Sequence, residues 1–267
     1  VRTPAARRDT PGLDTRRIDL PDEFPDDALG GADVVVHAAY ATQQVDRETS
    51  IRVNMLGTRR VVDAARRSGT RLVFVSSLSA HEGALSSYGR GKLAVEATLD
   101  PARDLIIRPG LVLAADGGLA FRMWRSVARS PIIPLFDGGE QETQTIHIDD
   151  LCLGIANAIE AGTTGLLTLA EPDGITLRAL LTLFAQSLEK DPTFVSLPSR
   201  PSQWLLRLVE LTRLPLPVSS ENLLGLMSLR TAEAGASASR VGLRVRPSHE
   251  SVESLAPLVR ASLGGAA

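Results

Sequence analysis

Three short runs of apolar, mostly β-branched residues stand out in the first part of the chain. They lie at residues 33–39 (DVVVHAA), 71–77 (RLVFVSS) and 104–108 (DLIIR). Because their apolar positions are continuous rather than alternating, the runs are typical of parallel strands that are buried on both faces. Helical patterns at residues 47–68 and 87–99 separate them. This alternation predicts right-handed crossovers and an α/β fold with a parallel sheet.

After Pro109 and Gly110 the pattern changes and helices dominate. Helices are predicted at residues 119–128, 149–160, 177–188, 203–213 and 251–263, short strands at 145–148 and 166–170, and Pro- and Gly-rich breaks at 192–201 and 215–217. The sequence therefore predicts an α/β domain over residues 1–110. It predicts a smaller, mostly helical region over residues 111–267, some of whose elements return to the first domain.

The composition fits a folded chain with a sizeable core. The 267 residues are 43% hydrophobic and carry a formal net charge of -2, so no excess of positive charge is available to bind a nucleic-acid backbone. The single cysteine, Cys152, excludes an intrachain disulfide, and no cysteine and histidine spacing indicates zinc. No run of about 18 uncharged apolar residues indicates a membrane span. We expect a soluble, cytoplasmic protein that binds neither nucleic acid nor a membrane.

The strongest chemical motif is YGRGK at residues 88–92, eleven residues after Ser77. Tyr88 and Lys92 are four positions apart, so on a helix they share one face and the ammonium can lie beside the phenol. A nearby cation stabilises a phenolate and lowers the pKa of the phenol. A serine hydroxyl at the neighbouring strand end can hydrogen-bond a reacting carbonyl or alkoxide. Because the chain has only two tyrosines and two lysines, we interpret the pair as catalytic rather than as a solvated helix face.

With these residues the sequence resembles the short-chain dehydrogenase/reductase superfamily, specifically its extended branch, the NAD-dependent epimerase/dehydratase family. Further matches occur in the family's order: Asp19-Leu20, His37-Ala38-Ala39, Asn54 in an N-x-x-G-T pattern, Ser76-Ser77, Arg108-Pro109-Gly110 and His147 to Asp150. The likeness covers residues 1 to about 170 and is only general over the last hundred residues.

The resemblance implies a Rossmann-type domain that binds NAD or NADP over residues 1–110, and a substrate-binding region over residues 111–267. It implies that Ser77, Tyr88 and Lys92 carry an NAD(P)-dependent redox reaction on a small alcohol or carbonyl substrate. Epimerases and dehydratases of the family use the same three residues, so the outcome of the reaction stays open. The cofactor-binding positions it implies are Arg2, Asp19, Leu20, His37, Ala38, Ala39, Asn54, Tyr88, Lys92 and Pro109. Of these, Arg2 favours NADP over NAD, because an arginine accepts the 2′-phosphate.

Two features depart from the family pattern. The glycine-rich phosphate loop and its first βαβ segment are absent from the sequence as given, and we expect them upstream of Val1. Nucleotide-sugar enzymes of the family usually show R-x-x-N-V-Y-G, whereas residues 108–114 read RPGLVLA. The second difference weakens the interpretation of the substrate as a nucleotide sugar.

Several alternatives stay open. A cofactor-sensing or scaffold protein of the same fold is the alternative to an enzyme; the missing loop favours it and the intact Ser77, Tyr88 and Lys92 oppose it. Ser76 and Ser79 compete with Ser77 for the catalytic hydroxyl. The oligomeric state is also open, with a homodimer as one option.

Two histidines invite other functional interpretations. His37 could act as a base, but we expect its backbone to line the cofactor and its side chain to pack. His147 with Asp149 and Asp150 could suggest a metal. However, Asp149 before an apolar helical run is typical of a helix N-cap, so no metal site is predicted.

Overall fold

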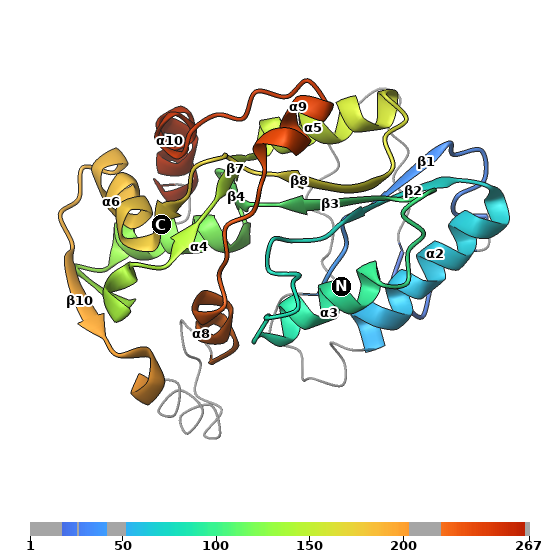
Figure 1. The fold of residues 1–267 in the computed structure, drawn as a ribbon. Helices are drawn as coiled ribbons and strands as arrows, with labels where there is room; N and C mark the ends of the chain where they lie inside the picture. Colours follow the sequence, from blue (N-terminus) through green and yellow to red (C-terminus); the bar gives the residue numbers. More distant parts are fainter. Residues whose placement is uncertain (1–17, 26, 42–51, 203–219, 265–267) are drawn as a thin grey trace. The chain divides into compact units, whose positions relative to one another are not determined.

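The computed structural model describes residues 18–25, 27–41, 52–202 and 220–264. The chain forms two compact units, residues 1–73 and 74–267, and each is described by itself. The main sheet has four strands in the order β1-β2-β3-β8. The predicted α/β fold with a parallel, Rossmann-type sheet is confirmed (Figure 1). The predicted domain boundary near residue 110 stays a prediction.

The first unit contains a strand and a helix that the sequence predicts. Strand β1 spans Val34–His37, a π-helical turn η1 spans Arg52–Leu56, and helix α2 spans Gly57–Ser68. Helix α2 buries Val61, Ala64 and Ala65, as its amphipathic pattern requires. It ends at Gly69, whose φ of 74° is the left-handed conformation that favours glycine at a helix C-terminus.

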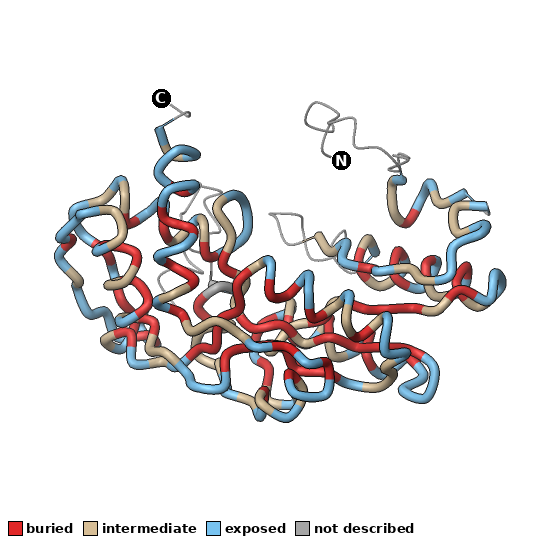
Figure 2. The backbone as a smooth tube through the Cα atoms, turned by 90° about the horizontal axis from the view of Figure 1, so that it is seen from above, coloured by how far each residue is buried: buried red, intermediate tan, exposed pale blue. Residues whose placement is uncertain are grey.

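In the second unit, parallel strands carry the segments that form the candidate site. Strand β2 spans Arg71–Val75 and crosses the boundary between the units; β3 spans Leu105–Pro109 and β8 spans Gly165–Leu169. β3 and β8 pair in parallel, with Leu105 opposite Gly165 and Pro109 opposite Leu169. Buried residues form continuous stretches along such strands, whereas the helices alternate buried and exposed positions (Figure 2). This is the burial that the continuous apolar run at residues 104–108 predicts.

Seven helices of the second unit lie within the described residues. They are α3 (Ser87–Glu96), α4 (Gly118–Arg129), α5 (Ile148–Glu160), α6 (Leu177–Ser187), α8 (Ser220–Met227), α9 (Gly235–Arg240) and α10 (Ser248–Gly264). Figure 1 shows α3 on one side of β3 and β8, and α5 and α9 on the other. The helix predicted at residues 203–213 lies outside the described residues. Among the helices of the described segments, none is long and apolar enough to cross a membrane.

Among the short strands of the second unit, the one predicted at residues 145–148 is confirmed as β7, and the others described here were not predicted. β4 (Leu111–Leu113) pairs in parallel with β7 (Thr145–His147), and β5 (Ile132–Phe136) pairs in parallel with β10 (Thr193–Leu197). β6 (Glu142–Thr143) and β9 (Ile175–Thr176) form an antiparallel pair. The interpretation of residues 192–201 as a break between helices was wrong at β10, because pairing with β5 supplies hydrogen bonds that local propensity does not show.

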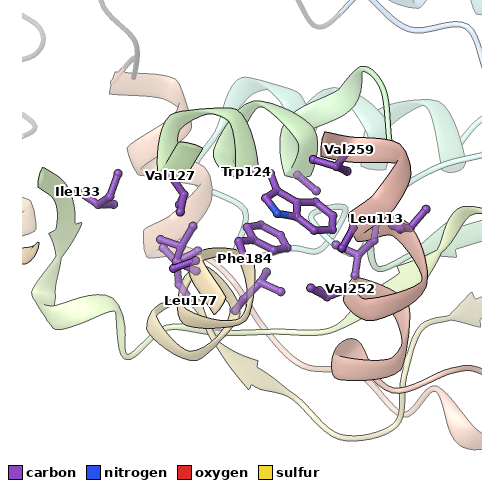
Figure 3. Close-up of a cluster of buried hydrophobic side chains, with 14 of the residues drawn as sticks. Leu113, Trp124, Val127, Ile133, Leu177, Phe184, Val252 and Val259 are labelled. Carbon is purple, nitrogen blue, oxygen red and sulfur yellow. The ribbon is translucent and has the colours of Figure 1, made fainter. Parts of the chain in front are cut away.

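The core of the second unit lies among α4, α6, α10 and β4. Trp124 and Phe184 stack with ring centroids 4.5 Å apart, and Leu113, Val252 and Val259 surround them (Figure 3). The Trp124 indole donates a hydrogen bond to Ser187 Oγ at 3.0 Å, which satisfies its buried N–H. This core packs α4, α6, α10 and β4 against one another and includes no residue of the main sheet.

Candidate functional site

The end of β2 brings Ser77 to the catalytic helix. The Ser76 amide donates to the Ile107 carbonyl at 2.7 Å and the Leu78 amide to the Pro109 carbonyl at 3.2 Å, so the backbone after β2 continues along β3. The Ser77 side chain forms a hydrogen bond with the Tyr88 phenol on α3. Its Oγ also accepts a hydrogen bond from the Ser79 amide at 3.1 Å. The structure thus brings two of the three predicted catalytic residues, Ser77 and Tyr88, together.

Lys92, the third predicted residue, is buried one helical turn after Tyr88. It is 2% exposed, its Nζ donates to the Val75 carbonyl at 2.6 Å, and it lies 4.7 Å from the centroid of the Phe74 ring. The carbonyl and the ring face both stabilise a cation in a site with little water. Val75 is the last residue of β2, so this hydrogen bond fixes the ammonium close to the strand end that carries Ser77.

Burial shifts the pKa values of both ionisable groups of the site. It lowers the pKa of Lys92 to about 8, and the charge of Glu96 opposes that decrease. Burial raises the pKa of Tyr88, and the hydrogen bond with Ser77 acts in the opposite direction. In each case low polarity favours the neutral form. The expectation that a nearby cation lowers the pKa of the Tyr88 phenol was therefore wrong, because burial raises that pKa and favours the protonated phenol.

The start of α3 is fixed by groups from three segments. Ser86 is the N-cap, and its Oγ accepts from the Gly89 amide at 3.2 Å. A carboxylate oxygen of Glu221, on α8, accepts from the Ser87 amide at 2.7 Å and from its hydroxyl at 2.8 Å. A Cβ at Gly89 would lie 2.3 Å from the Ser79 carbonyl oxygen. Glycine at the second position of YGRGK thus allows the helix to approach the loop after Ser77.

In the first unit, each fixed residue of the N-x-x-G-T pattern has a structural role. The Asn54 amide pairs with both backbone groups of Ala41, accepting from its N–H at 2.7 Å and donating to its carbonyl at 3.2 Å. A Cβ at Gly57 would lie 3.0 Å from Leu20 Cβ. Thr58 Oγ1 is 2.9 Å from His37 Nε2. The pattern therefore secures the segment after β1, and the His37 ring packs against α2 as expected.

We expect Asn54→Ala to destabilise the protein by about 1–3 kcal/mol. The substitution removes both side-chain hydrogen bonds to Ala41, and Asn54 is buried, so the backbone groups lose partners that water replaces poorly. Urea unfolding of the variant and the parent protein measures the difference. Asn54→Asp, which keeps the acceptor but not the donor, should lie between the two; equal stability of all three proteins would contradict the assigned role.

The remaining predicted cofactor residues differ in burial and in their contacts. Asp19 forms a two-way backbone bridge with Glu23, at 3.1 and 2.6 Å, while Ala38 and Ala39 are exposed directly after β1. Pro109 is buried at the end of β3. Arg2, on which the preference for NADP depends, lies outside the described residues. The structure therefore leaves that preference a prediction.

Residues 3–167 match the NAD dependent epimerase/dehydratase family, which is more than half of the chain. The chain belongs to this family. A "Ceramide reductase" of Caulobacter vibrioides is 30% identical over 173 residues, covering 63% of this chain and 54% of the relative. A "4-hydroxy-2-methyl-3-oxo-4-farnesyl-3,4-dihydroquinoline-1-oxide ketoreductase" of Stigmatella aurantiaca is 28% identical over 190 residues, covering 60% and 55%. The chain spans about half the length of these curated relatives.

A solved structure has the same fold at lower identity. The structure described as "MoeE5 in complex with UDP-glucuronic acid and NAD" superimposes with a TM-score of 0.68 and 18% identity, covering 89% of this chain and 82% of that chain. The likeness supports a Rossmann-type fold.

The family's later landmark, His147 to Asp150, has a structural explanation that corrects one expectation. His147 rather than Asp149 is the N-cap of α5, and its Nδ1 accepts from the Asp149 amide at 3.0 Å. Asp150 accepts three hydrogen bonds from Arg246: from the amide at 2.9 Å, from Nε at 2.8 Å and from Nη2 at 2.6 Å. In the described part of the chain no group of three metal-ligating side chains comes together.

The pairing of Asp150 with Arg246 predicts a pH-dependent contribution to stability. Burial raises the pKa of Asp150, but the hydrogen bonds and charge of Arg246 outweigh it and hold the pKa below its usual value. A carboxylate with a lowered pKa stabilises the fold above its unfolded-state pKa of about 4 and loses that contribution as the pH falls. Asp150→Asn should therefore cost about 1–3 kcal/mol at pH 7, and the cost should shrink below about pH 4.

Asp149→Asn is the matched control for this experiment. Asp149 is 77% exposed, and its carboxylate lies 3.9 Å from the Arg246 guanidinium, too far for a hydrogen bond. Its ion pair therefore contributes little to stability. Denaturant unfolding of both variants between pH 3 and pH 7, a range chosen to span the unfolded-state pKa of about 4, measures the difference. A cost at Asp150 that did not vary with pH would show that its charge is not involved.

Sequence reasoning missed an open, polar hollow on the surface of the second unit. Glu142, Leu229, Arg230 and Thr231 line this hollow, whose volume is about 440 Å³. It lies near the loop after Ser77, because a Cβ at Gly83 would be 2.7 Å from Arg230 Nη2. His81 Nε2 is also 2.8 Å from the Ser228 carbonyl oxygen. No local motif marks these residues, since Glu142 lies 87 positions before the adjacent Leu229, Arg230 and Thr231.

Proposed function

We propose that the chain is an NAD(P)-dependent oxidoreductase that acts on a carbonyl or alcohol group through Ser77, Tyr88 and Lys92. The hydrogen bond between Ser77 and Tyr88 beside the buried Lys92 ammonium carries the proposal. Tyr88 gives its phenolic proton to the carbonyl oxygen in reduction and takes it back in oxidation. Ser77 orients that oxygen, and Lys92 stabilises the phenolate that Tyr88 becomes. The reductase names of two relatives favour redox chemistry over epimerisation or dehydration.

The cofactor positions are proposed within each unit separately. In residues 1–73, the exposed Ala38 and Ala39 leave the backbone accessible, and Asn54 holds the following segment at Ala41, which fits a dinucleotide. Asp19 and Leu20 are proposed to meet the adenine, and Arg2 a 2′-phosphate. In residues 74–267, the Lys92 ammonium and the Tyr88 hydroxyl fit a ribose, and Pro109 is proposed to border the nicotinamide. The nicotinamide, when bound, supplies or accepts the hydride.

The substrate is proposed to bind to residues 111–267. The open hollow lined by Glu142, Leu229, Arg230 and Thr231 supports this, because Arg230 lies against Gly83, on the segment between Ser77 and Tyr88. Leu111 and Leu113 replace the asparagine and tyrosine usual in nucleotide-sugar enzymes. Together with the lipid-like molecules in the relatives' names, this favours a largely apolar ketone over a nucleotide sugar.

A cofactor oxidation assay tests the proposed function. The protein is mixed with NADPH or NADH and a panel that contains long-chain keto-lipids, quinolone ketones and UDP-sugars, and the loss of reduced nicotinamide is followed. We expect turnover with an apolar ketone and faster reaction with NADPH. The second candidate is a protein that senses NAD(P) without turnover. Calorimetric binding of NADP without reaction on any member of the panel would favour that candidate.

A further inference from the structure

Glu96 is a buried carboxylate that the proposed proton transfer does not use. It lies on α3 four positions after Lys92 and eight after Tyr88, so the three side chains follow one face of the helix. The residue is 8% exposed. A carboxylate at this depth is costly unless cations and hydrogen-bond donors surround it. Its partners therefore indicate what it does.

The partners of Glu96 come from two strand ends. Arg108, on β3, donates from Nε to Oε1 at 3.0 Å and from Nη2 to Oε2 at 2.5 Å, a bidentate pair of the strong kind. The Ser76 hydroxyl donates to Oε1. Ser76 directly precedes Ser77, and Arg108 directly precedes Pro109. One carboxylate thus ties α3 to the ends of both β2 and β3, next to the residues proposed to act on substrate and cofactor.

We propose that Glu96 is a positioning residue of the Ser77, Tyr88 and Lys92 site, which fixes α3 against the two strand ends and holds a negative charge one helical turn from Lys92. The inference rests on the function proposed above for that site. Glu96 itself contacts neither substrate nor cofactor in this role.

The surroundings of Lys92 support the electrostatic part of the proposal. From β2, the ammonium meets the Val75 carbonyl and the Phe74 ring, which are both uncharged. On its own helix, Tyr88 lies one turn before Lys92 and Glu96 one turn after it. From β3, Arg108 is bonded to the Glu96 carboxylate. Burial lowers the pKa of Lys92 to about 8, and Glu96 opposes this decrease, so loss of the Glu96 charge lowers the pKa further.

The lysine content of the chain makes a direct measurement practical. Lys92 and Lys190 are its only lysines, so isotope-labelled lysine gives two NMR signals, which Lys190→Arg assigns. We expect Glu96→Gln to lower the pH at which Lys92 titrates by about one unit. Arg108→Gln removes the ion pair but keeps the carboxylate, so Lys92 should titrate at or above its pH in the parent protein. A purely structural ion pair would affect both variants alike.

A double variant guards against loss of folding. Glu96→Gln with Arg108→Gln removes both members of this ion pair together, so neither is left buried without the other, and Lys92 should again titrate at lower pH. An unchanged titration in Glu96→Gln, an equal decrease in Arg108→Gln, or failure of both Glu96 variants to fold would each overturn the proposal. The titration needs neither cofactor nor substrate, so its result stands apart from any failure of the proposed function.

Discussion

Replacing Tyr88 by phenylalanine is expected to lower turnover by about 10²- to 10⁴-fold, the range typical of a lost general acid or base. Phenylalanine fills the same volume without the hydroxyl, so the substrate oxygen loses its proton source. The measurement is the initial rate with saturating cofactor and the best substrate of the panel. Because Tyr88 also forms a hydrogen bond with Ser77, thermal unfolding of the variant is measured alongside.

Two further observations make the Tyr88 result specific. Calorimetric titration should show that Tyr88→Phe still binds the dinucleotide within about tenfold of the parent protein, since Lys92 keeps its hydrogen bond to Val75. Retention of more than about a tenth of the parent rate would exclude the phenol as the proton donor. In that case another hydroxyl near the site, such as Ser77, would have to take the role.

Much of the first part of the fold can be predicted from the sequence, because continuous runs of β-branched apolar residues are typical of strands. The expected burial on both faces was wrong for β1, where Val36 is 42% exposed. The runs at residues 33–39, 71–77 and 104–108 became β1, β2 and β3, with ends shifted by a few residues. The pair Tyr88 and Lys92 can be predicted from helical spacing alone, and Ser77 can be predicted from its position at the end of a strand. These features depend on neighbours along the chain.

The elements that sequence reasoning missed depend on distant partners. β5 contains Pro134 and exposes Ile132, and β10 is mostly exposed, so neither shows the apolar run of a buried strand. Their pairing across about 60 residues supplies the stabilisation. The Glu221 carboxylate reaches Ser87 across 134 positions, and no spacing rule predicts such a contact.

Glu96 was overlooked for a different reason. A glutamate in a helix is usually solvated, and its charge attracts no attention in a sequence. The signal was present in its spacing, because Glu96 continues the i, i+4 line of Tyr88 and Lys92. A charged residue on the face of a helix already assigned to the interior requires a partner, and Arg108 on the next strand was the cation available.

Replacing Lys92 by methionine is expected to reduce both turnover and cofactor affinity. Methionine keeps the apolar contacts with Phe74, but the phenolate loses its cation and the ribose loses a charged hydrogen-bond donor. We expect a rate loss of about 100-fold. We expect the dissociation constant of the dinucleotide to rise about 10- to 100-fold, which corresponds to one charge-assisted hydrogen bond. Stopped-flow rates and calorimetric titration measure the two effects separately.

Lys190→Met is the matched control, because Lys190 is the only other lysine and is exposed. Its rate and affinity should equal those of the parent protein. Normal cofactor affinity in Lys92→Met, with the rate alone reduced, would remove the ribose contact and leave Lys92 only its effect on Tyr88. A normal rate with weakened cofactor binding would leave Lys92 only its contact with the ribose and would remove its effect on Tyr88. We propose that one protonated ammonium serves both the phenol and the ribose, and burial and Glu96 act on that same group. Lys92→Met should therefore lose turnover and cofactor affinity together.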